Sequence, residues 1–365
     1  MDTFVLRSFV TAIAILAVGA SACGKSGSKT TDVKKSLEDG FAIGLLLPES
    51  KTTRYETFDK PLIEKYVHAS CPKCTVLYQN ANQDAAKQQT QADALLNQGI
   101  QVLIIDAVDA AAAASIVEKA KQQKVPVIAY DRFASGPIDS FVTFDSERIG
   151  QEQGKALLEA VSQGGDPKRG AIVMINGAIT DPSSADYKRG AHSVLDGKVQ
   201  IGFEVDTPDW SPDKAQQEME QAMTKLGADK IIGVYVANDG MASGVIAALK
   251  GHGVTPIPPV TGQDAELAAI QRLISGDQYM TIYTPYSRQA EAAAKMALAA
   301  AQGKPVQGDD VRENATHHKV PTVQLPVVAV TKANVKDTVL ADGIYKTAEI
   351  CTSEYAPACK QAGLL

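Results

Sequence analysis

Strand-like and helix-like segments alternate along most of this chain, and this alternation constrains the fold more than any other feature. Short apolar runs predict strands at 41–47, 75–79, 102–106, 125–130, 170–176, 199–206, 230–237, 260–263 and 280–284. Amphipathic or Ala-rich segments between them predict helices at 58–69, 84–97, 110–123, 147–162, 211–226, 240–250, 266–275 and 288–302. Repeated strand-helix units predict parallel sheets with helices on both faces. In a chain of 365 residues they indicate an α/β protein with two Rossmann-like lobes.

Pairs of polar residues follow three of the apolar runs. The pairs are Asp131-Arg132, Asn238-Asp239 and Gln263-Asp264. Ligands of open α/β sheets bind outside the carboxyl ends of the strands, so these side chains are expected to share one pocket. Carboxylates, an amide and a guanidinium are suited to a molecule with many hydroxyl groups, such as a sugar.

The N-terminus has the layout of an export signal. A basic Arg7 precedes an apolar stretch at 9–19, and small residues then lead to Cys23. We expect 1–22 to be a signal peptide and Cys23 to become a lipidated N-terminus, as in bacterial lipoproteins. The segment 23–39 is polar and reads as a flexible tether.

The other four cysteines form two close pairs. In an oxidising compartment they predict the disulfides Cys71–Cys74 and Cys351–Cys359. A C-x-x-C can also be a redox dithiol or half of a zinc site. The first pair, however, follows a helical segment instead of opening one, and no second C-x-x-C or nearby His supplies further zinc ligands.

Composition excludes several classes of function. The net charge is −6 and no basic patch interleaved with aromatics is present, which argues against a nucleic-acid partner. No long apolar run follows the signal, so no membrane span is expected. The five histidines are scattered or lie in a polar loop, and we expect no metal site and no cofactor.

Several motifs together resemble one family. The motifs are Ala129–Arg132, 142–145 followed by Ile149-Gly150, 209–212, 237–240 and 261–267. In order and spacing they are similar to the xylose-binding branch of the bacterial periplasmic sugar-binding proteins of ABC transporters, over about 41 to 347. The resemblance implies a type I periplasmic binding protein, in which three hinge strands join two lobes that close on one aldopentose or aldohexose. It implies no catalysis.

The resemblance also implies a domain organisation. We expect an N-terminal lobe at 40–144 plus 285–318, a C-terminal lobe at 145–284 plus 319–347, and a disulfide-pinned tail at 348–365. The protein would be an exported monomer, lipid-anchored on the outer face of the cytoplasmic membrane, and it would deliver a monosaccharide to ABC permease subunits.

The sugar contacts of the family carry over to nine positions. They are Arg54, Phe58, Asp131, Arg132, Trp210, Asn238, Asp239, Asp264 and Thr284. Carboxylates accept hydrogen bonds from vicinal hydroxyls, Arg and Asn donate to oxygen lone pairs, and aromatic faces cover the C–H faces of a pyranose.

Two departures from the family pattern touch the expected pocket. The chain has Asp181-Pro-Ser-Ser184 where the pattern has Asp-Asn-Asn-Ala, so two amides are absent. It also has Thr284 where the pattern often has Lys, which predicts weaker xylose binding and better tolerance of a hexose.

Other interpretations remain open. Asp239 and Asp264 precede helical segments and could be simple N-caps. The carboxylates Asp131, Asp239 and Asp264 could in principle form the acid and base of an exported glycoside hydrolase. The same fold also serves sugar-sensing receptors that dock on a membrane signalling protein.

Overall fold

The computed structural model describes residues 36–316 and 318–365. The predicted signal peptide, Cys23 and most of the tether lie outside the described residues. Residues 34–365 form one compact unit. Among the helices of the described part, each is too short or too polar to cross a lipid bilayer.

The first sheet has seven strands in the order β10-β11-β5-β4-β3-β1-β2. All neighbours are parallel except β10 and β11, and β1 pairs with β2 from Ala42 opposite Thr75. The strands are β1 (Ala42–Leu47), β2 (Thr75–Asn80), β3 (Val102–Ile105), β4 (Val127–Tyr130), β5 (Ser140–Phe144), β10 (Asp310–Glu313) and β11 (Lys319–Leu325).

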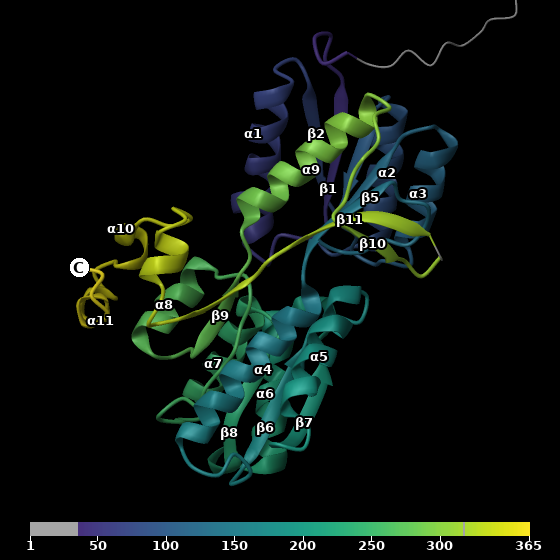
Figure 1. Ribbon diagram of the computed structural model, residues 1–365. Coiled ribbons are helices and arrows are strands. Elements are labelled where there is room, and N and C mark those ends of the chain that lie inside the picture. Colours follow the sequence, from purple (N-terminus) through teal and green to yellow (C-terminus); the bar gives the residue numbers. More distant parts are fainter. Residues whose placement is uncertain (1–35, 317) are drawn as a thin grey trace, which may run out of the picture. The chain divides into compact units, whose positions relative to one another are not determined.

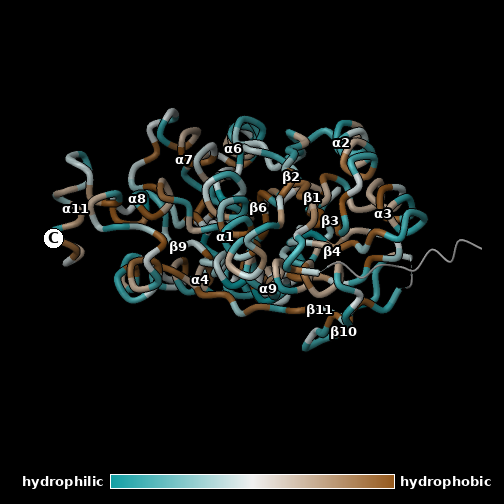
Figure 2. The backbone as a smooth tube through the Cα atoms, turned by 90° about the horizontal axis from the view of Figure 1, so that it is seen from above, coloured by the Kyte–Doolittle hydropathy of each residue, from teal (hydrophilic) through white to brown (hydrophobic). Residues whose placement is uncertain are grey.

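Helices cover both faces of this sheet (Figure 1). They are α1 (Lys60–Ser70) and α9 (Tyr286–Ala301) on one face, and α2 (Ala85–Asn97) and α3 (Ala113–Gln122) on the other. Side chains alternate along β3, so Val102 and Ile104 join the core under α1 and α9, while Leu103 and Ile105 join the core under α2 and α3. This two-sided burial explains why the strands are continuously apolar in sequence. The hydrophobic colour of the central strands in Figure 2 follows the same pattern.

The second lobe is built around β6 (Ala171–Asn176), β7 (Gln200–Asp206) and β8 (Ile231–Val236), parallel in the order β7-β6-β8. A separate antiparallel pair is formed by β9 (Met280–Tyr283) and β12 (Val328–Thr331). The helices of this lobe are α4 (Ser146–Gln163), α5 (Pro182–Leu195), α6 (Pro212–Leu226), α7 (Asp239–Gly251) and α8 (Leu267–Ser275).

Glycines let two helix pairs of this lobe approach closely. A Cβ on Gly150 of α4 would lie 1.9 Å from the carbonyl oxygen of Tyr187 in α5. A Cβ on Gly244 of α7 would lie 2.1 Å from the carbonyl oxygen of Pro212 in α6. Both positions therefore need glycine for packing.

The chain passes three times between the lobes, after β5, after β9 and after β11 (Figure 1). The third passage corrects an expected boundary, because 319 onward was assigned to the C-terminal lobe. Instead, Lys319–Leu325 pairs in parallel with β5 and belongs to the first sheet. Only the following strand, Val328–Thr331, joins the second lobe, through β9.

Two local features differ from the sequence-based expectation. The strand expected at 260–263 is reduced to a single bridge between Val260 and Val234, after two prolines that have no N–H to donate. The helix α5 was not predicted. It begins at Pro182, and the Asp181 side chain caps it by accepting a hydrogen bond from Ser183 N.

The C-terminal segment packs against α8. Its short helices are α10 (Thr347–Ile350) and α11 (Ala356–Gln361), and Tyr345, Ile350 and Cys359 share a core with Leu273. The structure joins Cys351 to Cys359. It also joins Cys71 to Cys74, where α1 ends before β2.

Candidate functional site

A small pocket lies between the carboxyl ends of strands from both lobes. The space left between the two walls is narrow. The lining residues are Thr52, Arg54, Tyr55, Asp131 and Arg132 from the first lobe, and Asp181, Tyr187, Trp210, Asn238, Gln263 and Asp264 from the second.

Arg54 is held in place from three sides. Its Nε and Nη2 atoms pair with the Asp59 carboxylate at 2.8 and 3.1 Å. Nη2 also donates to Gln289 Oε1 at 2.6 Å, and the guanidinium lies over the Tyr286 ring at 4.6 Å from its centroid. The fourth side of the guanidinium faces the pocket, where Nη1 donates to Asp131 Oδ1 at 3.1 Å. The fixed fork thus presents a preorganised donor beside a carboxylate.

Asp131 carries this carboxylate on a strained backbone. Its φ of 61° lies in the left-handed region, which favours glycine. Positive φ values also occur at Asp209 and Trp210 after β7, and at Asp264 and Ala265 before α8. Strain of this kind costs roughly 1–3 kcal/mol per residue and collects at binding sites. Here it aims side chains from three loops at one pocket.

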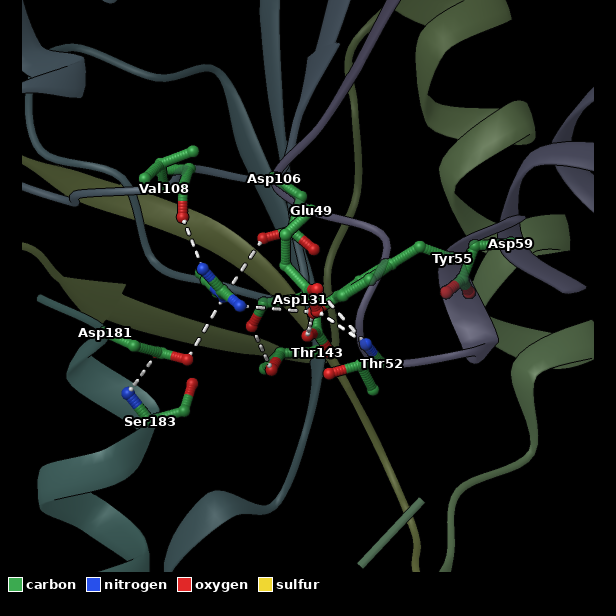
Figure 3. A network of polar contacts seen from close by, with 12 residues as sticks. Glu49, Thr52, Tyr55, Asp59, Asp106, Val108, Asp131, Thr143, Asp181 and Ser183 are labelled. Carbon is green, nitrogen blue, oxygen red and sulfur yellow. Dashed lines mark hydrogen bonds and ion pairs between the residues drawn. The ribbon is translucent and has the colours of Figure 1, made fainter. Parts of the chain in front are cut away.

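Arg132 is the second buried guanidinium. Its Nη1 donates to the Ala107 carbonyl at 3.1 Å, and its Nε lies 3.1 Å from Asp181 Oδ2. Asp106, which follows β3, is 3.5 Å from the same Nε. Tyr55 completes the surroundings, because its hydroxyl accepts from Arg132 Nη2 at 3.4 Å. Figure 3 shows Asp181, at the start of α5, reaching this network from the second lobe.

Trp210 forms the aromatic wall. Its ring packs edge-to-face on Tyr187 at 6.3 Å and is held close to the backbone of Gly177. Both aromatic rings line the pocket. They offer apolar surface that can cover the C–H face of a sugar ring.

Asn238 and Asp264 complete the second-lobe wall. Asn238 caps α7, since its side-chain oxygen accepts from Met241 N at 2.9 Å. Asp264 Oδ1 accepts from Gln263 Nε2 at 2.7 Å, and the Asp264 carbonyl accepts from the Tyr286 hydroxyl. The cap interpretation and the binding interpretation therefore both apply to Asn238.

Burial sets the protonation of the carboxyls. It raises the pKa of Asp264 well above its usual range, although Arg54 opposes the shift. It also raises the pKa of Asp181, against the opposing effect of Arg132. A ligand hydroxyl that donates to such a carboxyl favours its charged form and so opposes the effect of burial.

Phe58 and Thr284 were predicted to contact the ligand, and the structure places both outside the pocket. Phe58 stacks on Tyr286 at 5.3 Å and meets Tyr345 edge-on at 5.8 Å, so its ring packs against the C-terminal segment. Thr284 is fully buried at the connection between β9 and α9. It is not among the residues that line the pocket, and its effect on the choice of sugar stays a prediction.

Asp239 also lies outside the pocket and has a structural role. Its Oδ1 accepts from Gln278 Nε2 at 2.7 Å, and its Oδ2 accepts from Thr281 Oγ1 at 2.8 Å and from Glu266 N at 3.0 Å. The side chain points into the lobe because these donors surround it there. Burial raises the pKa of Asp239 to about 7.

Sequence reasoning missed three lining residues, which are Thr52, Tyr55 and Tyr187. Gln263 and Asp181 were expected at the pocket but were not named as ligand contacts, and both line it. The sequence does indicate a position for Asp181. An Asp followed by a Pro is typical of a helix start, and a helix that starts after a strand begins at the ligand edge of the sheet. No sequence pattern points to Tyr187 as a pocket residue, because it lies within a helix whose orientation depends on packing.

The arrangement can hold a compact polyhydroxylated ring. Carboxylates, guanidiniums and amides line the pocket, and two aromatic rings provide an apolar face. Within residues 36–316 and 318–365, no three His, Cys, Asp or Glu side chains group as metal ligands.

Comparisons with known proteins agree with this geometry. The family model described as periplasmic binding protein domain matches residues 43–305. The D-xylose-binding periplasmic protein of Escherichia coli (strain K12) is 32% identical over 314 residues, which are 84% of this chain and 92% of that protein.

Two solved structures are also similar. An ABC transporter solute binding protein from Clostridium phytofermentans with bound β-D-glucose has a TM-score of 0.79 and 25% identity, covering 85% of this chain and 99% of that one. A carbohydrate transporter solute binding protein from Chloroflexus aurantiacus, in complex with D-glucose, has a TM-score of 0.76 and 27% identity, with coverage of 85% and 98%.

Proposed function

The chain belongs to the periplasmic binding protein family as a sugar-binding component of an ABC transporter, and on this premise we propose that it captures one aldopentose or aldohexose between its lobes. Members of this family bind and release their ligand, so the chain is not an enzyme. The captured sugar is delivered to a membrane permease.

One observation carries the proposal. The small pocket combines the Arg54–Asp131 pair from one lobe with Trp210, Asn238 and Asp264 from the other. A ligand bound to both halves stabilises the closed arrangement, because it has partners in both lobes only there. Release of the ligand is then coupled to separation of the lobes.

The proposed ligand is a single pyranose. The relative from Escherichia coli is a D-xylose-binding protein, and the two solved relatives hold glucose. Micromolar affinity, about 8 kcal/mol, is within reach of a ligand of this size.

The proposal includes a lipid anchor. The sequence up to Cys23 has the pattern of a lipoprotein signal, and the tether would place the lobes outside the cytoplasmic membrane. Cys23→Ser is expected to release the protein from the membrane or to leave the signal uncleaved. A mature N-terminus that mass spectrometry finds unmodified would contradict the anchor.

The deciding experiment is calorimetry with D-xylose, L-arabinose, D-glucose and D-galactose. At least one should bind with micromolar affinity. Asp264→Asn should weaken binding at least tenfold, because an amide replaces one acceptor with a donor while Asn still tolerates the positive φ. The exposed Asp229→Asn is the control and should bind normally. Absence of binding across the panel refutes the proposal, and hydrolysis of nitrophenyl glycosides would point to a hydrolase instead.

A further inference from the structure

Two contacts between the lobes form a wall beside the pocket. Arg132 Nε lies 3.1 Å from Asp181 Oδ2, and both side chains are almost fully buried. Next to this ion pair, Ala110 N donates to the Thr180 carbonyl at 3.1 Å. Both contacts join a loop of the first lobe to the segment between β6 and α5.

A larger groove lies behind this wall. It is more spacious than the pocket. The name outer groove refers here to the space lined by Asp109, Ala110, Phe133, Thr180, Pro182 and Asp186, among others.

The pocket and the outer groove adjoin at the ion pair. Arg132 and Asp181 line the pocket, while their chain neighbours Phe133, Thr180 and Pro182 line the outer groove. The Arg132–Asp181 contact is therefore the partition between the two spaces.

The outer groove is chemically suited to a second sugar ring. Phe133 offers an aromatic surface and is held by stacking on Phe141 at 4.5 Å. Asp186 and Arg189 of α5 supply polar groups on the same groove. Sugar rings bind to this combination of an aromatic face and charged hydrogen-bonding groups.

We propose that the Arg132–Asp181 ion pair is a gate that limits the pocket to a single sugar ring, and that Asp181 is the residue that determines this limit. The inference rests on the proposed function. While the pair is closed, a substituent that extends from the bound ring has no path into the outer groove. Asp106 lies 3.5 Å from the same Nε, without a hydrogen bond to it, and stays beside the guanidinium when Asp181 is replaced.

The variant Asp181→Ser tests the gate. Serine is also a good N-cap, so it can still accept from Ser183 N and keep the start of α5. It is too short to pair with Arg132 across the pocket. Asp213→Ser is the control, because Asp213 is exposed in the first turn of α6 and lines neither the pocket nor the outer groove.

Calorimetry compares D-glucose and D-xylose with maltose, cellobiose and xylobiose. Wild-type protein should bind at least one monosaccharide and each disaccharide at least 100-fold more weakly. With Asp181→Ser the monosaccharide should bind more weakly, and the ratio to at least one disaccharide should fall below tenfold. Asp213→Ser should keep the wild-type ratio. Should the serine variant fail to fold, Asp181→Gly is also tolerated at an N-cap, has no side chain to pair with Arg132, and carries the same expectation.

The outcomes separate the two proposals. If wild-type protein binds a monosaccharide and the ratio is unchanged in the Asp181 variant, the gate is refuted and the proposed function stands. Equally tight binding of a disaccharide by wild-type protein also refutes the gate. If wild-type protein binds no sugar, the proposed function fails and the gate fails with it.

Discussion

Gly177 holds the aromatic wall of the pocket in position, and replacing it with alanine should move that wall. A Cβ on Gly177 would lie 2.0 Å from Cη2 of Trp210 and 2.4 Å from Cζ2 and Cζ3. Gly177 follows β6 without a positive φ, so alanine imposes no backbone strain. The whole effect of Gly177→Ala is therefore steric.

The size of the effect follows from these distances. Carbon atoms in ordinary contact are about 3.5 Å apart or more, so the indole has to move by about 1.5 Å. Overpacking of a well-filled site costs about 1–3 kcal/mol. Because Trp210 lines the pocket and Gly177 does not, the displaced ring should intrude on the ligand. We expect sugar affinity to fall at least tenfold, or about 1.4 kcal/mol.

The assay uses an internal reporter. Trp210 is the single tryptophan of the chain, so its emission reports on the pocket alone. Titration of wild-type protein with a bound sugar should change the emission, and Gly177→Ala should shift the starting spectrum and weaken the titration. Gly251→Ala is the control, because no atom lies within 4 Å of its added Cβ at the end of α7. It should bind normally. Unchanged affinity and emission in Gly177→Ala would refute the close packing of Trp210.

Three further predictions concern residues outside the pocket. Burial raises the pKa of Asp239 to about 7, above its unfolded value of about 3.9, so its contribution to stability is present at low pH and lost as pH rises toward 7. Urea unfolding should show this slope in wild-type protein and not in Asp239→Asn. Cys351→Ser should lower the free energy of unfolding by about 2 kcal/mol, because it opens the Cys351–Cys359 loop; an unchanged urea midpoint contradicts this. Thr284→Val should leave calorimetric sugar affinity within about twofold, because Thr284 does not line the pocket; a larger change would place it in the site.

The strands and most helices could be predicted because their signals are local. A strand buried on both faces is continuously apolar, as β3 and β4 are, and such a run can be recognised without its partners. The expected strand at 260–263 and the missed helix α5 show the limit. Pro258 and Pro259 have no backbone N–H to donate to a neighbouring strand. The helix α5 is stabilised by packing on α4, which its own sequence does not indicate.

The topology was enough to predict that the candidate site lies at the carboxyl ends of the strands. Parallel strands end at one edge of their sheet, so Asp131 and Arg132 were expected at the ligand edge of the first sheet, and Asp264 follows the bridge at Val260 in the second lobe; the packing of the two lobes brings all three to one pocket. Side-chain direction is a separate matter. Asn238 lines the pocket, whereas its neighbour Asp239 turns into the lobe toward Gln278. Adjacent residues at a helix start point in different directions, and only the surrounding donors decide which one faces the ligand.

The sequence by itself determined the α/β class, the order of elements and the polar groups available at the strand ends, because each depends on short-range patterns. Only the tertiary structure decided that Phe58 packs on the C-terminal segment and that Asp181 reaches Arg132. Those contacts join residues far apart in the chain. Their energies depend on burial and on the few ångströms between partners, and neither is encoded in any local segment.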